Sequence, residues 1–537
     1  MRILITTGLR RTASVAFATL AAFVLTPSAA AQGTHVAQAN DLYKDITPAR
    51  YSHPIILPAL AEIEDAPAAV ADVTTARLIA PGDPLWDEVE RWRTSAPQRA
   101  VLEALRKVTE QSSFDSAMAF AQPYGSAGIP VELLRAGMYT ELGDPPLLAA
   151  ADHRYLDEME TMRNLVHVEA TKLTTDGNVD DAAELLLRLA VFGRQMVERE
   201  FMVESYWGYR TLLDAISRVR DVLFMDFESG RNANPARLRA IIDWLDREGI
   251  LGLDRLSFPR ADRIGSQQLI DLVYRERGGV REAPFIEAMS RLGSGTRPLR
   301  RFAQSDRWRN AAGSQADWFD IGDALARVYD GWSERWKLAP GSPVLALPFP
   351  YWDYTDEAKY AVISKPLLPS RPEGGPLAGE IFFDFRKALD VERVGTKQAI
   401  GVLGRLYERG RYPPELASIR PRWIEVIEPD EYSEIPLGAH AKPAMTFFVP
   451  VRDDYIANRR DEAQPHFMQV FPGDGSNFGV ELYDDSFVLY SVGPNHYDDN
   501  ARRVHQDIES EIGDYLIWPP VQGLYRKHLR DTGQLGG

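Results

Sequence analysis

Apolar residues recur at helical spacing along most of the chain from residue 85 onward. The first two stripes consist of Leu85, Val89 and Trp92, and of Val101, Leu105 and Val108. Side chains at positions i, i+4 and i+7 share one face of an α-helix, so the pattern predicts two amphipathic helices. Residues 32–85 are rich in alanine and proline and show no such period. We therefore expect residues 32–85 to form an extended arm across the surface.

The helical pattern is strongest between residues 155 and 225. Two successive stripes contain Met162, Val166, Ala170 and Leu173, and then Ala182, Leu185, Leu186, Leu189 and Phe192. The polar segment from Thr174 to Asn178 separates them, and helices joined by so short a turn must lie antiparallel. With small residues at Gly177 and Ala182, this hairpin loosely resembles a tetratricopeptide-type unit. A regular repeat of about 34 residues is not visible, so an irregular helical domain remains the alternative.

Helical patterning continues to about residue 340 and predicts an α-helical domain over residues 86–340. Within this domain, Asn234 is placed to cap a helix that begins with Pro235. Prolines then become frequent, and because proline disrupts helix interiors we expect residues 341–390 to form a junction. The aromatic run at residues 349–354 suits a linker that packs on a neighbouring domain. A sugar-binding platform beside the acidic side chains is the alternative.

Residues 391–537 follow a different pattern, one helix and then several short strands. Ile400, Leu403 and Tyr407 share a helix face, and Gly410 follows as a C-terminal glycine. The strand-like runs are Thr446–Val451, Phe467–Phe471, Phe487–Val492 and Tyr515–Trp518. The predicted fold is therefore a mainly α N-terminal domain of helical hairpins, followed by a smaller α+β module with a short antiparallel sheet.

Three strings in this module resemble the major pseudopilin of type II secretion. The string from Leu406 to Pro413 resembles its helix end, and the strings Phe487–Asn495 and Gly513–Trp518 resemble its last strands. A helical domain followed by this ending is similar to a group of uncharacterised exported bacterial proteins. The resemblance implies a pseudopilin-like globular domain. The chain departs from the family in two places. Pseudopilins have a processed leader and a membrane-spanning assembly helix directly before the globular part, whereas about 390 residues precede the module here. The segment Asn500–Ile512 is an extra segment in the loop that binds calcium in that family.

The resemblance also implies a calcium site in the loop before the last strand. Its candidate ligands are Asn495, Asp498, Asp499 and Asp514, which supply the carboxylate and amide oxygens that calcium prefers. The same residue types are common in turns, where they cap their own backbone, so a hydrated acidic turn is the alternative. No other cofactor is expected.

The first 31 residues have the composition of a cleavable signal peptide. Three arginines precede an apolar run of about 13 residues, and Ala29 and Ala31 fit the preference for small residues at a cleavage site. The run is shorter than the roughly 20 residues that span a bilayer, so the mature chain is expected to lack a membrane span. Arg10 and Arg11 leave both the general secretory route and the twin-arginine route open. The expected location is periplasmic or extracellular.

Composition narrows the classes of partner and of chemistry. Without the three signal arginines the formal charge changes from −16 to −19, which makes nucleic acid an unfavourable partner. The chain has no cysteine, which excludes disulfides, thiol nucleophiles and thiolate metal sites. Stability must therefore come from packed cores, and a chain of this length can form them.

The sequence lacks the usual catalytic motifs, such as a zinc-binding H-E-x-x-H helix or a G-x-S-x-G nucleophile elbow. No catalytic residue is therefore assigned. We expect an exported, non-catalytic binding or scaffold protein that associates with an envelope or secretion-system protein. The alternatives are an exported hydrolase with a site between the helical domain and the C-terminal module, and a calcium-stabilised structural protein of the cell surface.

Overall fold

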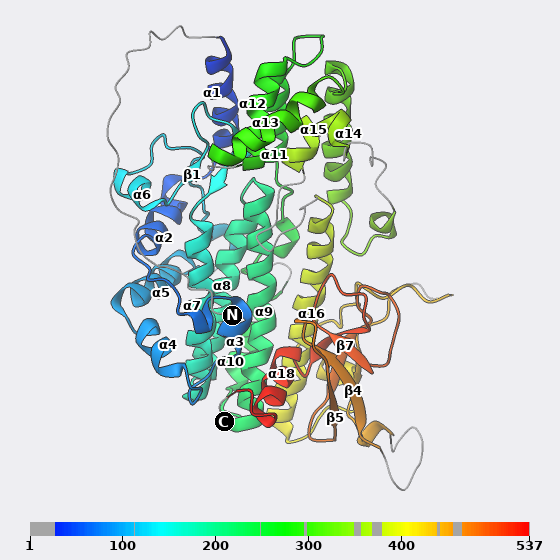
Figure 1. Cartoon of the computed structure of the whole chain (residues 1–537). Coiled ribbons are helices and arrows are strands. Elements are labelled where there is room, and N and C mark those ends of the chain that lie inside the picture. Colours follow the sequence, from blue (N-terminus) through cyan, green and yellow to red (C-terminus); the bar gives the residue numbers. More distant parts are fainter. Residues whose placement is uncertain are drawn as a thin grey trace, which may run out of the picture.

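The fold is mainly helical and ends in a smaller α+β part, as predicted (Figure 1). The computed structural model describes residues 27–111, 113–246, 249–294, 298–347, 356–367, 379–437, 441–454 and 464–535. Long antiparallel helices stand in the middle of the molecule, a group of shorter helices lies at one end, and the sheet lies to one side. None of the described helices is long and apolar enough to cross a membrane.

The N-terminal segment is helical, which corrects the extended arm predicted for residues 32–85. Its helices are α1 (Pro27–Asn40), α2 (His53–Leu60), α3 (Val73–Leu78), α4 (Trp86–Arg93), α5 (Ala96–Val108) and α6 (Val131–Ala136). In α2, Pro54 occupies the first turn, where the missing N–H is not needed. Ile56, Leu57 and Leu60 are fully buried and pack toward α5. Pro54 therefore begins a short helix, Pro58 lies inside the same helix, and neither keeps the chain extended.

Three long helices form the centre of the molecule. They are α7 (Leu156–Thr175), α8 (Val179–Val197) and α9 (Met202–Ser229), followed by α10 (Pro235–Trp244). The predicted break between Thr174 and Asn178 separates α7 from α8, and the side chain of Asn234 caps α10. The backbones of α8 and α9 approach closely where Gly193 faces Gly208. A Cβ added at Gly208 would lie 2.4 Å from the backbone nitrogen of Val197.

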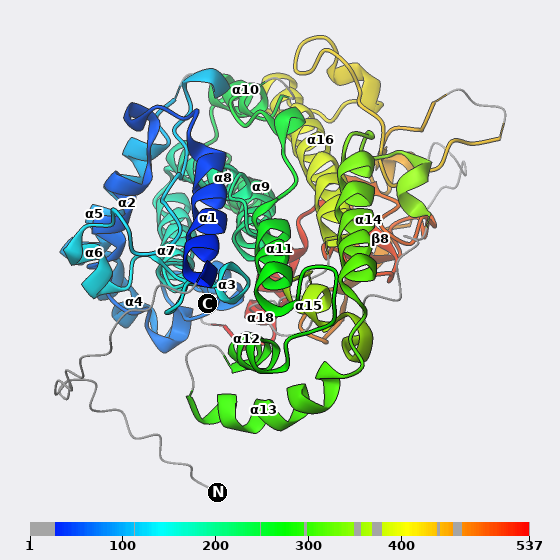
Figure 2. The ribbon, with the colours of Figure 1, turned by 90° about the horizontal axis from the view of Figure 1, so that it is seen from above.

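The next five helices gather at one end of the bundle, as Figures 1 and 2 show. They are α11 (Ala261–Val273), α12 (Glu282–Ser294), α13 (Pro298–Ala312), α14 (Trp318–Trp336) and α15 (Glu357–Leu367). Helix α1 lies beside α11. The predicted junction 341–390 is therefore partly helical, and α15 contains Pro366 within it. The aromatic run 349–354 lies outside the described residues.

Helix α16 (Ile381–Arg409) joins the helical part to the sheet. It runs beside α9 and α10 and contacts two strands, so the predicted boundary between residues 390 and 391 falls inside a continuous helix. Gly410 ends α16 in the left-handed conformation with φ 69°, as the sequence predicted.

The C-terminal part contains a six-stranded sheet with the order β3-β6-β8-β7-β4-β5. The strands are β3 (Thr446–Phe448), β4 (His466–Phe471), β5 (Phe478–Leu482), β6 (Val488–Ser491), β7 (Arg503–His505) and β8 (Asp514–Trp518), and helix α18 (Val521–Asp531) follows. The four predicted strand runs correspond to β3, β4, β6 and β8. The predicted sheet was antiparallel, whereas β7 pairs in parallel with β4 and with β8, so the sheet is mixed. A separate pair, β1 (Thr140–Glu141) and β2 (Asp152–His153), is antiparallel.

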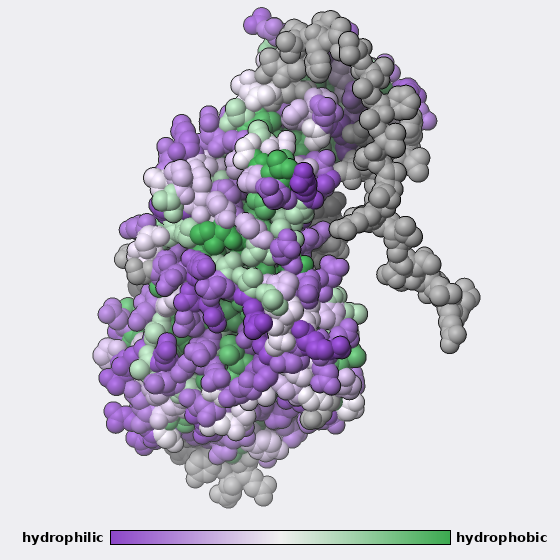
Figure 3. All heavy atoms as spheres, turned by 90° about the vertical axis from the view of Figure 1, so that its left-hand side faces the viewer, coloured by the Kyte–Doolittle hydropathy of each residue, from purple (hydrophilic) through white to green (hydrophobic). Residues whose placement is uncertain are grey.

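One buried apolar cluster extends from Ile56 in α2 to Leu524 in α18. A buried ion pair also connects the parts, because Arg220 of α9 pairs with Glu392 of α16 and donates to the carbonyl of Ile517 in β8. Figure 3 shows the face that carries α2, α5 and α6, where hydrophilic residues cover most of the surface and apolar residues gather above its middle.

Candidate functional site

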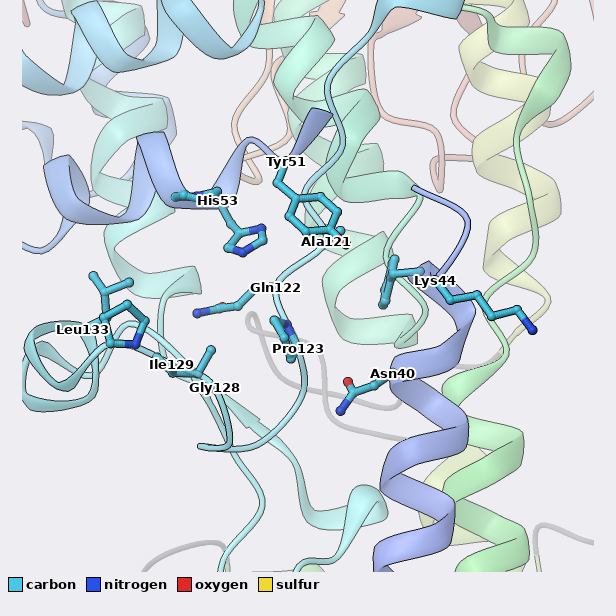
Figure 4. Close-up of a pocket in the computed structure, with 13 residues that line it drawn as sticks. Asn40, Lys44, Tyr51, His53, Ala121, Gln122, Pro123, Gly128, Ile129 and Leu133 are labelled. Atoms are coloured by element: carbon cyan, nitrogen blue, oxygen red, sulfur yellow. The ribbon is translucent and has the colours of Figure 1, made fainter. Parts of the chain in front are cut away.

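A cavity of about 400 Å³ lies between the end of α1, the start of α2 and the segment that leads into α6 (Figure 4). Its wall consists of Asn40, Tyr43, Lys44, Tyr51, His53, Pro54, Ala121, Gln122, Pro123, Gly128, Ile129, Pro130 and Leu133. Two stretches of the chain that are distant in sequence, residues 40–54 and 121–133, thus form a single hollow.

Local sequence features hold these segments in place. Pro54 lies in the first turn of α2, and Pro130 directly precedes α6. The proline rings restrict the backbone torsion angle φ at the start of both helices. Asn40 binds the main chain of Tyr124 twice: its Nδ2 donates to the carbonyl at 3.2 Å, and its Oδ1 accepts the N–H at 2.7 Å. The wall is therefore formed by the protein before any ligand binds.

Two polar atoms of the wall lack partners. Nδ1 of His53 and Oε1 of Gln122 are buried and make no hydrogen bond within the part of the chain that the structure describes. Gln122 is held from its other end, because Nε2 donates to the carbonyl of Met138 at 2.7 Å. In Figure 4 both side chains point toward the same space, with Ile129 and Leu133 beside it. An unmet buried acceptor is costly, and a ligand that donates a hydrogen bond would satisfy it.

A buried ion pair supports the wall from behind. Nε of Arg199 donates to Glu204 at 2.6 Å, and both side chains are fully buried. Nη1 of Arg199 donates to the main-chain carbonyl of Gln122 at 3.0 Å. The guanidinium also lies over the rings of Tyr43 and Tyr124, at 4.8 and 4.4 Å from their centroids. The link between α8 and α9, which contains Arg199, and the first turn of α9, which contains Glu204, therefore position the cavity wall.

Tyrosines connect this ion pair to the cavity. The hydroxyl groups of Tyr43 and Tyr124 lie 2.8 Å apart, and both accept the N–H of Glu200. The hydroxyl of Tyr124 also donates to Glu204 at 3.0 Å, and that of Tyr155 donates to the same carboxylate. Glu204 therefore accepts from an arginine and two phenols, which replaces the water it loses on burial.

The titratable groups around the cavity keep one charge state near neutral pH. Burial, together with the positive charge of Arg199, lowers the pKa of His53 to about 4, so its ring is neutral. Burial raises the pKa values of Tyr43, Tyr124 and Tyr155. Burial alone would raise the pKa of Glu204, but Arg199 and His153 outweigh it and the pKa is lowered. This arrangement suits binding better than proton transfer, which requires a pKa near the operating pH.

The predicted calcium ligands are only partly brought together. Asp514 accepts the N–H of Asp499 at 3.1 Å and that of Ala501 at 2.7 Å. Asp498 accepts from the hydroxyl of Tyr490 and the N–H of Asn500, at 2.9 and 2.8 Å.

Asn495, the fourth candidate, caps its own turn by accepting the N–H of Tyr497. Most of these oxygens therefore bind protein donors. Among the described residues, no group of three or more acidic or histidine side chains is arranged to hold a metal ion. Calcium binding stays a prediction, and a rise in melting temperature with calcium that a chelator reverses would establish it.

Sequence reasoning singled out none of the cavity residues. They come from segments about 70 residues apart, residues 40–54 and 121–133, and they match no motif. The only signal is indirect, since Pro54 and Pro130 are residues of the kind that begins a helix. The segment 40–54 lies within residues 32–85, for which the sequence predicts an extended arm and no cavity.

Comparison with known proteins adds no analogy, since no protein-family model, curated protein or solved structure matches the chain.

Proposed function

We propose that the protein is an exported, non-catalytic binding protein and that the cavity between α1, α2 and α6 receives a small ligand. The observation that carries this proposal is a preformed hollow whose wall contains two buried polar atoms without partners. Its volume of about 400 Å³ falls within the range typical of ligand sites. The predicted signal peptide supports export to the periplasm or beyond.

The chemistry of the wall favours binding over catalysis. His53 is the one described wall residue with an imidazole, and its lowered pKa keeps it neutral but far from the value of an efficient general base at neutral pH. The hydrolase alternative is supported by the aromatic run 349–354, which lies outside the described residues, and by the general preference of ligand sites for the junction between two domains. Association of the pseudopilin-like module with an envelope or secretion-system protein remains part of the proposal.

The test is a small-molecule screen by thermal shift on the mature chain, followed by calorimetry of any compound that raises the melting temperature. Ile129→Trp places a large ring in the cavity, whereas Val131→Trp puts the same ring two residues away at an exposed position that does not line it. We expect ligand binding to be lost in Ile129→Trp and kept in Val131→Trp. Circular dichroism establishes that both variants are folded.

Two results would argue against the proposal. The first is the absence of any stabilising compound in a broad fragment collection. The second is a compound that binds folded Ile129→Trp as tightly as the wild type, because that ligand would occupy another site.

A further inference from the structure

We infer that the cavity selects a neutral ligand, a compound with an apolar body and one N–H or O–H group that donates a hydrogen bond to Oε1 of Gln122. This inference rests on the proposed function and names the chemical class of its ligand.

The unpartnered end of Gln122 is an acceptor. Its Nε2 donates to the main-chain carbonyl of Met138 at 2.7 Å, which fixes the orientation of the amide and leaves Oε1 at the other end. The side chain is fully buried, and Oε1 has no partner within the described part of the chain. A carboxylate would bring a second acceptor to this oxygen, whereas an N–H or O–H group would satisfy it.

Two other polar side chains of the wall are already engaged within the protein. Asn40 uses both ends of its amide on the main chain of Tyr124. The hydroxyl of Tyr43 lies 2.8 Å from that of Tyr124 and accepts the N–H of Glu200. These groups already have the hydrogen bonds they need. A ligand therefore gains most by meeting Oε1 of Gln122.

The described wall directs no charged side chain into the cavity. Lys44 is the one charged residue among those that line it, and Figure 4 shows its side chain pointing away from the hollow. Arg199 lies behind the wall and is paired with Glu204 at 2.6 Å. The ring of His53 is neutral near pH 7, because its pKa is lowered to about 4. An ion in the cavity would lose water without gaining an opposite charge, which favours a neutral ligand.

Apolar side chains lie beside the free acceptor. Ile129, Pro130 and Leu133 line the cavity, and Figure 4 shows Ile129 and Leu133 next to the space toward which His53 and Gln122 point. Burial of an apolar body against them supplies affinity without regard to hydrogen bonding. The donor then decides between ligands of the same shape, since a ligand without it leaves Oε1 unpaired.

Three probes isolate the donor: indole, benzofuran and indole-2-carboxylate, each titrated into the protein by ligand-observed NMR. Indole and benzofuran have the same shape, but only indole carries an N–H, and the more apolar benzofuran would bind more tightly if burial alone decided. We expect indole to bind about three- to tenfold more tightly than benzofuran. Indole-2-carboxylate has a negative charge next to its N–H and should bind most weakly.

A matched pair of variants assigns the preference to Gln122. Gln122→Met removes the acceptor at similar side-chain length, and it should make the affinities for indole and benzofuran equal. Gln195→Met is the control, because Gln195 of α8 is also buried, donates from Nε2 to the carbonyl of Val108 at 2.8 Å, and has an unpartnered Oε1 within the described chain. Gln195 does not line the cavity, so its variant should keep the preference for indole.

Circular dichroism establishes that both variants are folded. If Gln122→Met does not fold, the comparison of indole with benzofuran in the wild type still decides whether a donor is preferred. Loss of indole binding in folded Ile129→Trp then places that preference in the cavity, and unchanged binding would contradict it.

The outcomes separate this inference from the proposed function. Equal or tighter binding of benzofuran, or a preference for indole that survives Gln122→Met, would overturn the role of the donor while leaving a binding cavity. Tightest binding of indole-2-carboxylate would overturn the preference for a neutral ligand. If none of the three probes binds, the ligand class is wrong, and the screen with Ile129→Trp then decides whether the cavity binds any ligand.

Discussion

At the scale of single residues, the cavity depends on an ion pair that is removed from water. Taking Arg199 and Glu204 out of water costs several kcal/mol each, and their mutual attraction offsets this only with further hydrogen bonds. Two phenols and two main-chain carbonyls supply these bonds. Loss of one partner would therefore leave an isolated buried charge.

We predict that Glu204→Gln lowers the free energy of unfolding by about 3–5 kcal/mol, because Arg199 then stays buried without a counter-ion. Glu103→Gln is the control, since Glu103 pairs with Lys107 at 3.9 Å on the surface and both side chains are more than half exposed. That change should cost less than about 1 kcal/mol. Denaturant titration measures both. Similar small losses in the two variants would show that the buried pair adds little.

Asp262 gives the fold a dependence on pH. Its Oδ2 accepts the N–H of Met202 at 2.8 Å, and burial, with help from Glu204 and Glu200, raises its pKa to about 7. Between the pKa of the unfolded chain, roughly 4, and about 7, the folded state binds more protons than the unfolded state. The contribution of Asp262 to stability therefore falls as the pH rises through this window.

Asp262→Asn should remove this term, because the amide stays neutral and still offers an oxygen to Met202. We expect the wild type to lose about 1–3 kcal/mol of unfolding free energy relative to the variant when the pH is raised from 5 to 8. Denaturant titrations at several pH values measure it. A difference that stays constant over this range would contradict the raised pKa.

At the scale of secondary-structure elements, the tightest helix contact was not visible in the sequence. The hairpin of α7 and α8 was predicted because its stripes and its turn are contiguous. The closest backbone approach instead lies between α8 and α9, where Gly193 faces Gly208. The sequence does not show whether a glycine inside a helix only destabilises that helix or allows a second helix to approach closely, because this depends on the partner helix.

We predict that Gly208→Ala destabilises the protein by about 2 kcal/mol or more, because its Cβ would meet the main chain of Met196 and Val197. Gly322→Ala in α14 is the matched control, since a Cβ there meets nothing within 4 Å. It should be neutral or stabilise the protein by about 0.5–1 kcal/mol, through helix propensity. Thermal melts measure the stability of both variants. Equal effects would show that α8 and α9 can move apart to accommodate the Cβ without loss of stability.

The sequence predicted the strands that are rich in apolar residues. It did not predict the strands that form only because a neighbouring strand pairs with them. The strands β6 and β8 are buried along their whole length, so their runs stand out in the sequence. The strand β7 has three residues inside an apparent loop, and β5 contains Gly479 and Glu481. Both exist because a neighbouring strand offers hydrogen bonds, which no local pattern records. The parallel pairing of β7 made the sheet mixed for the same reason.

At the scale of the whole molecule, the helical part and the sheet share one interior. Helix α16 contributes to both, and Glu392 within it binds Arg220 of α9 and Tyr515 of β8. The sequence indicated two regions because composition changes along the chain. The buried core does not follow this change in composition, because it depends on contacts between residues that are distant in sequence. Arg220 and Glu392, for example, are separated by 172 positions.

We predict that the protein unfolds in a single cooperative transition, because separating the two regions would expose this common core and break the buried pair. Far-ultraviolet circular dichroism and tryptophan fluorescence should report the same denaturant midpoint. A fragment of residues 391–537 should not fold alone, since it begins inside α16. Two separated transitions, or a folded fragment, would show that the regions are independent.

The support that Arg199 and Glu204 give to the cavity also sets an order of events during synthesis of the chain. Because the chain is made from its N-terminus, residues 40–54 and 121–133 emerge well before the link between α8 and α9 follows. Until then, the phenols of Tyr43 and Tyr124 have neither their carboxylate nor their guanidinium partner. The segments that would hold the ligand are thus among the first to emerge, yet they acquire their shape only after about 200 residues have been made.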